Sequence, residues 1–414
     1  MRVETLLPLG KLDPGLRAAE TPLDLGRVIE DARLVESLGY DGLAVEETKV
    51  DPYVVMALAA AATTRLRLTT AVAMAFPRSP TITAMSAWNI QKLSRGRFVL
   101  GLGSQVRGHI TRRFGLPYRP PGPWMRDYVR AVRAVWTAWQ QRTPLAFESP
   151  HYNLSLMVPL FDPGPIEHPD IPIHVAAVNP TMCRFVGEVA DGLRPHPVCT
   201  PRYIRDVMLP AMRAGAVAAG RSPALAVAMK PLICAAPDEA TLAARVPDVR
   251  ARVAFYASTP GYRVAFAVHG LGDLAAELAV LSRAQRWEEM PPRITDEVLH
   301  TYAVVGTFAQ IGRKLVDRYR GLVTDVEFSI PAATPGEQGI LRELLQQIRR
   351  ETAGSRPILT PSGGLWPLHR LAIVPPGLRP AHRVAGSGGR VPQRPDPPPP
   401  PGGRAQRGHH GTLV

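Results

Sequence analysis

The chain has 414 residues, 45% of them hydrophobic, and a formal net charge of +14. This composition is sufficient for a large core, and Cys183, Cys199 and Cys234 are too widely spaced to indicate a disulfide framework or a metal site. Half of the net charge lies in residues 355–414, where eight arginines and one aspartate stand among 13 prolines and 10 glycines. The charge therefore does not indicate nucleic-acid binding by the body of the chain.

Strand and helix signals alternate through the first 141 residues. Short apolar runs predict strands at 2–7, 42–46, 66–73 and 98–102. Apolar residues at helical spacing predict helices at 22–38, 51–63, 80–93 and 124–141. The fourth strand is apolar on both faces, which is typical of parallel sheets. Gly101 and Gly103 at its carboxyl end are predicted to leave room for a ligand against the backbone.

The alternation continues in the second half but is interrupted twice. Further strands are predicted at 171–177, 191–194, 226–235 and 325–330. Further helices are predicted at 180–190, 201–219, 237–256, 307–319 and 335–350. Residues 143–170 are rich in proline and read as a long insertion, and residues 257–300 read as an irregular region with further helix.

Eight strands alternating with helices predict an α/β protein, a (β/α)₈ TIM barrel with insertions over residues 1–350. A doubly wound open sheet is the alternative. Gly101 and Gly103 do not form a dinucleotide fingerprint, because the third glycine position of that motif is occupied by Val106. Residues 351–414, rich in proline, glycine and arginine, are predicted to form a disordered tail.

Several chemistry-bearing residues follow predicted strands, at the end of a barrel where active sites lie. Glu46 and Glu47 follow the second strand, His109 follows the turn after the fourth, and His196 follows the sixth. Asn179 is placed to cap the helix after the fifth strand, where free N–H groups suit a phosphate. Because no nucleophile motif or metal-spaced cluster is present, the pattern suits chemistry carried by a bound cofactor.

The sequence resembles the luciferase-like monooxygenase superfamily, whose members are barrels that use FMN or the deazaflavin coenzyme F420. The resemblance spans roughly residues 1–350 and rests on segments that occur in the family's order. They are Ser94 to Ser104, Tyr40 to Thr48 with Asp51 to Tyr53, Ala176 to Pro180, Gly187 to Gly192, and Val304 to Thr307. Within the superfamily, His196-Pro197 and Gln105 to His109 are most similar to F420-dependent oxidoreductases.

This resemblance implies a set of site residues. Expected to bind the cofactor are Glu46, the non-prolyl cis pair Ala71 and Val72 behind the deazaflavin ring, Gly103 and Ser104 near the ring, and Ala176, Ala177, Val178 and Asn179 at the phosphate. Better-known members carry histidine where this chain has Glu47, and glutamate near Val106. The catalytic acid or base is therefore expected among Glu47, His109 and His196.

The resemblance implies an oxidoreductase that transfers hydride between coenzyme F420 and an organic substrate. The alternatives are an FMN-dependent monooxygenase on the same barrel, a non-catalytic ligand-binding barrel and a nucleic-acid binder with a basic tail. The expected partner is a small-molecule substrate, with neither nucleic acid nor membrane and no metal, and a homodimer is left open. A cytoplasmic location is expected from the cysteine usage and the absence of an apolar run of membrane-spanning length.

Overall fold

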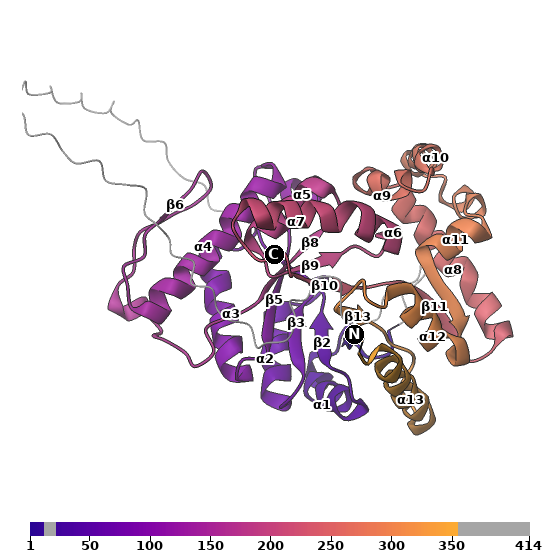
Figure 1. The fold of residues 1–414 in the computed structure, drawn as a ribbon, viewed down its shortest axis with the longest axis horizontal. Coiled ribbons are helices and arrows are strands. Elements are labelled where there is room, and N and C mark those ends of the chain that lie inside the picture. Colours follow the sequence, from indigo (N-terminus) through magenta and orange to yellow (C-terminus); the bar gives the residue numbers. More distant parts are fainter. Residues whose placement is uncertain (12–21, 355–414) are drawn as a thin grey trace, which may run out of the picture. The chain divides into compact units, whose positions relative to one another are not determined.

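The computed structural model describes residues 1–11 and 22–354, and within them eight parallel strands close into a barrel (Figure 1). The strands are β1 (Arg2–Leu6), β2 (Gly42–Val45), β3 (Arg67–Thr70), β5 (Phe98–Gly103), β8 (Ile173–Ala177), β9 (Gly192–Pro195), β10 (Ala226–Met229) and β13 (Asp325–Glu327). Each pairs with the next, and β13 pairs with β1 to close the ring. The predicted (β/α)₈ barrel is confirmed, and the open sheet is excluded by this closure.

Helices surround the strands (Figure 1). They are α1 (Val28–Leu38), α2 (Pro52–Ala62), α3 (Pro80–Ser94), α4 (Pro121–Gln141), α5 (Pro180–Val189), α6 (Pro201–Tyr203), α7 (Leu209–Ala218), α12 (Phe308–Tyr319) and α13 (Pro335–Thr352). The first helix begins later than predicted, because Asp24 caps a 3₁₀ turn at Leu25–Arg27 that leads into α1. Among the described residues no helix is both long and apolar enough to cross a membrane. Most of the predicted tail, residues 355–414, lies outside the described residues.

The predicted seventh strand, 226–235, is two strands that belong to different sheets. β10 ends at Met229, and β11 (Leu232–Ala236) pairs in parallel with β12 (Ala303–Thr307) outside the barrel. Pro231 lies between them and has no N–H for a ladder bond, which explains the break. Between β11 and β12 the chain forms α8 (Glu239–Ala257), α9 (Arg263–Ala267), α10 (Gly272–Arg283) and α11 (Asp296–Tyr302).

Two further short pairings complete the described structure. β4 (Ala73–Met74) continues the chain beyond β3 and pairs with the carboxyl end of β5. In the proline-rich insertion, β6 (Phe147–Glu148) and β7 (Asn153–Leu154) form an antiparallel hairpin beside α4 (Figure 1). The hairpin turn brings His151 and Tyr152 back toward α4, where Trp124 donates a hydrogen bond from Nε1 to the Tyr152 hydroxyl at 2.7 Å.

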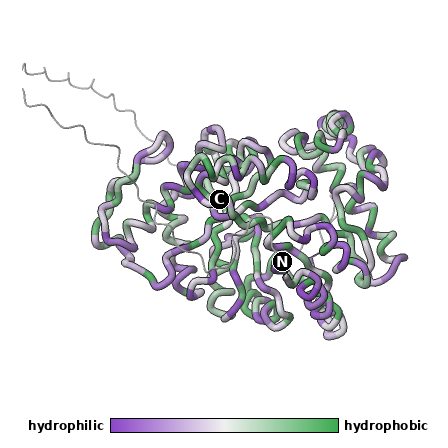
Figure 2. The backbone as a smooth tube through the Cα atoms, viewed as in Figure 1, coloured by the Kyte–Doolittle hydropathy of each residue, from purple (hydrophilic) through white to green (hydrophobic). Residues whose placement is uncertain are grey.

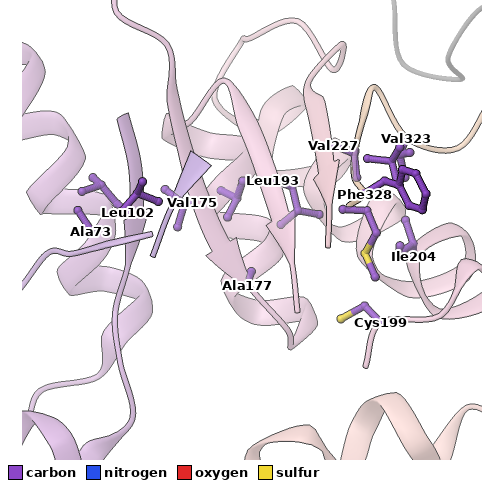
Figure 3. Close-up of a cluster of buried hydrophobic side chains, with 14 of the residues drawn as sticks. Ala73, Leu102, Val175, Ala177, Leu193, Cys199, Ile204, Val227, Val323 and Phe328 are labelled. Atoms are coloured by element: carbon purple, nitrogen blue, oxygen red, sulfur yellow. The ribbon is translucent and has the colours of Figure 1, made fainter. Parts of the chain in front are cut away.

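The strand register separates two chemically different faces of the barrel. Alternate residues such as Leu102, Val175, Leu193 and Val227 are buried and hydrophobic, and Figure 3 shows them in one apolar cluster with Phe328. Figure 2 shows the hydropathy along the chain, with hydrophobic stretches along the strands and hydrophilic ones on α13. Burial of this outward face against the helices supplies the main apolar core.

The inward face carries charged and small residues. Paired in register on it are Glu4 with Gly42, Gly42 with Arg67, Gly101 with His174, His174 with Gly192, Ala176 with Arg194, and Ala228 with Asp325. Arg194 is 6% exposed and donates a hydrogen bond to Glu4, which is 1% exposed. Asp325 accepts from Arg67 at 2.5 Å and from Arg2 at 2.7 Å. The barrel interior is therefore held together by ion pairs.

Glycines on β5 and β9 make room for this interior. A Cβ at Gly192 would lie 2.5 Å from the His174 ring, and a Cβ at Gly101 would lie 1.8 Å from the Thr70 carbonyl oxygen. A Cβ at Gly103 would meet Val72 Cγ2 at 2.4 Å. The two glycines therefore make room for β3 and for the chain that follows it. The sequence-based prediction that Gly101 and Gly103 leave this room for a ligand is wrong.

We predict that the Glu4–Arg194 pair tolerates joint replacement better than the loss of one partner. Glu4→Leu leaves the buried Arg194 charge uncompensated, so the free energy of unfolding should fall by about 3–5 kcal/mol. The double variant Glu4→Leu/Arg194→Met should recover much of that loss. Urea unfolding at neutral pH measures both values, and a double variant less stable than Glu4→Leu would contradict the prediction.

A second prediction concerns pH. Burial, and then the charges of Arg67 and Arg194, lower the pKa of His174 to about 3. The unfolded chain therefore binds a proton at this histidine below about pH 6.5 while the folded chain does not, and stability falls with pH between about 6.5 and 3. From pH 7 to pH 5 this group alone should remove about 2 kcal/mol.

The variant His174→Phe should reduce that loss by about the same amount in urea unfolding at pH 7 and pH 5. His300→Gln, on the exposed side of α11, is the matched control and should keep the wild-type difference. An unchanged pH dependence in His174→Phe would show that His174 does not titrate on unfolding.

Candidate site at the carboxyl ends of the barrel strands

The inner-face residues at the carboxyl ends of the strands form the mouth of the barrel. Glu46 continues the inner face of β2, His196 that of β9 and Lys230 that of β10. Lys230 Nζ donates to Glu46 Oε1 at 2.7 Å, so a side chain from β10 reaches one from β2 across the ends of β13 and β1. Lys11 Nζ lies 3.5 Å from Glu46 Oε2.

These charges fix the ionisation of Glu46. Burial on its own would raise the pKa of Glu46, but Lys230 and then Lys11 outweigh burial, and the pKa is lowered. Glu46 is therefore a carboxylate at neutral pH and is engaged by two cations. In this state it neutralises the positive charge of the mouth and has no proton to give.

His196 lies in the same cluster and is neutral. Burial, and then Lys230, lower its pKa to about 3, with Glu46 acting in the opposite sense. The Val198 N–H donates to His196 Nδ1 at 3.3 Å, so the proton of the neutral ring is assigned to Nε2. Tyr256 and Tyr262, from the insertion between β11 and β12, contact the ring with centroids at 4.8 and 4.1 Å. His196 therefore presents an N–H donor beside an aromatic wall.

Glu47 faces a different neighbour. Its Oε2 accepts from the Met74 N–H at 2.7 Å and from Arg78 Nη1 at 2.7 Å. Arg78 also donates to Asp51 at 2.9 Å. Glu47 thus holds β4 and the segment after it against the end of β2. Among the described residues no hydrogen bond or ion pair joins its side chain to that of Glu46 or His196.

The chain between β3 and β4, just before the residues that Glu47 holds, contains a cis peptide between Ala71 and Val72, as the family resemblance implied. Ala71 and Val72 are partly exposed, although Thr70 and Ala73 on either side are buried. Ser104 is partly exposed after the buried Gly103, and Val72 packs against Gly103. These predicted cofactor residues therefore form one accessible wall of the mouth.

The end of β8 forms a second wall. Ala176 and Val178 are partly exposed on the inner face, whereas Ala177 is buried between them. Asn179 caps α5 as predicted, its side chain accepting from the Met182 N–H at 2.8 Å. Asn179 and Thr181 are exposed, so the N-terminus of α5 is open to solvent.

His109 is separated from the other predicted catalytic residues. It lies exposed on the π-helical turn His109–Arg113 that follows β5. Arg113, at the end of the same turn, donates to the Thr48 carbonyl at 3.3 Å, which places this turn beside the Glu47 end of the mouth. Among the described residues His109 contacts neither His196 nor Glu47.

Sequence reasoning missed Lys230, Arg78 and the two tyrosines. Lys230 had a detectable signal, because a lysine followed by proline inside a supposed buried strand marks a strand end. Arg78 carried no signal, because its partner Glu47 is 31 residues away in sequence. Tyr256 and Tyr262 belong to a region without a legible motif.

A closed (β/α)₈ barrel with side chains gathered at the carboxyl ends of its strands defines a protein with its ligand site at the barrel mouth. A family model described as luciferase-like monooxygenase matches residues 2–325. The chain belongs to the luciferase-like monooxygenase family, as its motifs predicted.

Similar sequences occur in mycobacteria. An uncharacterised protein of Mycobacterium tuberculosis is 40% identical over 330 residues, covering 80% of this chain and 96% of the relative. A second M. tuberculosis protein, provisionally named a coenzyme F420-dependent oxidoreductase, is 32% identical over 206 residues, covering 47% of this chain and 56% of its own.

Solved structures share the fold at low sequence identity. The F420-dependent tetrahydromethanopterin reductase of Methanopyrus kandleri superposes with a TM-score of 0.65 at 18% identity, covering 85% of this chain and 99% of its own. The oxygenating constituent of 3,6-diketocamphane monooxygenase of Pseudomonas putida, in complex with FMN, gives 0.55 at 16% identity, covering 85% and 98%. Proteins that share this fold are thus named for either coenzyme.

We predict that Glu47 stabilises the segment after β4. Glu47→Ala removes a charged acceptor from the Met74 N–H and from Arg78, and should lower the free energy of unfolding by about 2 kcal/mol. Hydrogen exchange at the Met74 amide should accelerate. Asp51→Asn keeps the α2 cap and removes only a half-exposed charge from Arg78, so it should cost about 0.5 kcal/mol. Equal effects of the two changes would contradict this role.

Proposed function

We propose that this protein is an oxidoreductase that binds coenzyme F420 at the barrel mouth and transfers hydride between it and an organic substrate. The observation that carries the proposal is the accessible apolar wall made by Ala71, Val72, Ala176 and Val178 beside the neutral His196. These partly exposed positions lie at or just beyond the ends of β3 and β8, next to the buried Thr70, Ala73 and Ala177. The M. tuberculosis relative that is provisionally named a coenzyme F420-dependent oxidoreductase supports this choice of cofactor.

The residues present fit a flat, anionic cofactor. Small or β-branched side chains on two walls of the mouth suit a planar ring, and the open N-terminus of α5 suits a phosphate. Ala71, Val72 and Ser104 would hold the ring, and Asn179 with the first turn of α5 would hold the phosphate. Coenzyme F420, when bound, supplies hydride at carbon C5 of its deazaflavin ring.

The protein's own groups orient the substrate and control protons. The Nε2–H of neutral His196 would donate a hydrogen bond to a substrate oxygen, and it favours the negative charge that develops there as a carbonyl is reduced. Burial and the charge of Lys230 keep His196 neutral. Tyr256 and Tyr262 hold the ring of His196 and limit the access of water.

The second candidate is an FMN-dependent monooxygenase. It is favoured by the same open α5 N-terminus, because FMN and coenzyme F420 share a phosphate and a flat tricyclic ring. The structural likeness to an FMN complex gives the fold common to both alternatives.

Cofactor titration tests the proposal. The full chain should quench F420 fluorescence with a micromolar Kd and should bind FMN more weakly. Ala176→Phe fills the wall and should weaken F420 binding by more than about tenfold while leaving thermal unfolding unchanged. Ala218→Phe, on an exposed position of α7, is the matched control and should bind like wild type. Tighter binding of FMN would select the second candidate, and binding of neither cofactor would refute both.

A further inference from the structure

A hollow separate from the proposed cofactor site lies at the edge of the barrel mouth. Its lining includes none of the residues proposed to bind the cofactor. It has a volume of about 210 Å³ and is formed by the segment after β4, the segment after the π-helical turn, α4 and the β6–β7 turn. This volume is below the 300–1,000 Å³ that is typical of pockets for drug-sized ligands, and it suits a molecule with one ring. The hollow is lined by aromatic and basic side chains, which include Phe76, Arg78, Arg119, Trp124, His151 and Tyr152.

Stacked aromatic side chains form the floor of this hollow. Phe76 and Trp124 stack with ring centroids 3.7 Å apart and an interplanar angle of 4°. The His151 ring lies nearly parallel to Trp124, at 6.3 Å and 14°. Because Phe76 and Trp124 are buried, the floor is rigid and apolar, and it favours a flat ring over a flexible chain.

His151 is oriented by a buried carboxylate. Its Nδ1 lies 2.7 Å from Asp127 Oδ2, and Asp127 is 2% exposed. The carboxylate accepts, so Nδ1 carries a proton, and Nε2 is the ring atom left to accept a hydrogen bond. Among the described residues Nε2 has no hydrogen-bond partner, and it is not fully buried. Because His151 lines the hollow, Nε2 is accessible from it. The hollow thus offers a fixed acceptor for an O–H group.

Donors and positive charge surround that acceptor. The Tyr152 hydroxyl accepts from Trp124, which leaves its own proton to donate, and burial raises the pKa of Tyr152 to about 12. The charge of Arg119 acts on Tyr152, and Arg119 is exposed at the rim. Arg78 adds a second guanidinium, already paired with Glu47 and Asp51. This side of the hollow favours an anionic oxygen.

We propose that this hollow binds an aromatic hydroxy acid, whose ring lies on the aromatic floor, whose hydroxyl donates to His151 Nε2 and whose carboxylate faces Arg119. The site does not depend on the proposed cofactor, and no bond is made or broken in it. It places a planar, oxygen-bearing small molecule beside the barrel mouth.

Ligand analogues and variants together test the contacts. Titration calorimetry of the full chain compares 4-hydroxybenzoate with benzoate, which lacks the hydroxyl, and with phenol, which lacks the carboxylate. Wild type should bind 4-hydroxybenzoate about tenfold more tightly than either analogue, as one well-made hydrogen bond or ion pair allows. His151→Phe should abolish the preference over benzoate only, and Arg119→Gln should abolish the preference over phenol only. His300→Gln, remote on α11, is the control.

A third variant tests the tautomer. Arg126 donates to Asp127 Oδ1 at 3.1 Å, so in Asp127→Asn the amide oxygen should stay toward Arg126 and the NH₂ should face His151. The ring proton then moves to Nε2, and the preference for 4-hydroxybenzoate over benzoate should be lost while the protein stays folded by circular dichroism. A merely structural Asp127 would leave that preference intact.

The outcomes separate this proposal from the proposed function. Failure of 4-hydroxybenzoate to bind at millimolar concentration, or an equal loss of both ligands in His151→Phe, overturns the hollow as a hydroxy-acid site. F420 titration of the same His151→Phe preparation should match wild type, which shows that the barrel mouth is intact. Loss of F420 binding in wild type would refute the proposed function and leave this site standing.

Discussion

The burial of charge inside the barrel is the constraint on which the rest of the structure depends. Arg194 and Glu4 form a pair with almost no exposure, and Arg67 and Asp325 form another beside it. Charges in such a place are costly unless each is paired, so the register of the strands that carry them is restricted. A slip of one residue on β1 or β9 would separate Glu4 from Arg194 and leave both charges buried. The same slip would turn the apolar outer face of the strand inward, so both faces specify the register.

The same alternation determines the chemistry of the mouth. Because side chains alternate along a strand, the inner face that carries Arg194 also carries His196 two residues later. Lys230 reaches the mouth in this way from β10, and Glu46 from β2. The ion pair between them continues the polar interior to the surface of the barrel. The polar interior therefore continues into a polar rim, whose residues Glu46, His196 and Lys230 directly follow the ends of their strands.

The sequence predicted the barrel because its strands are short apolar runs separated by capped helices, such as α5 with Asn179 and α12 with Thr307. It failed at Lys230, where the runs before and after Pro231 look like one strand but enter two sheets. Family motifs predicted the positions of Ala71, Val72 and Asn179. Contacts between distant segments, such as Glu47 with Arg78 or Asp127 with His151, have no local pattern and needed the folded chain.

Two histidines near the barrel mouth show why residue identity alone does not determine chemistry. His196 accepts a backbone N–H at Nδ1, so its neutral ring presents a donor at Nε2. His151 faces a carboxylate at Nδ1, so Nδ1 carries a proton and Nε2 is the ring atom left to accept. The same side chain therefore presents different hydrogen-bonding atoms in the two places. The difference arises from one partner atom in each case, the Val198 nitrogen or the Asp127 oxygen, and it is set by the loop after β9 and by α4.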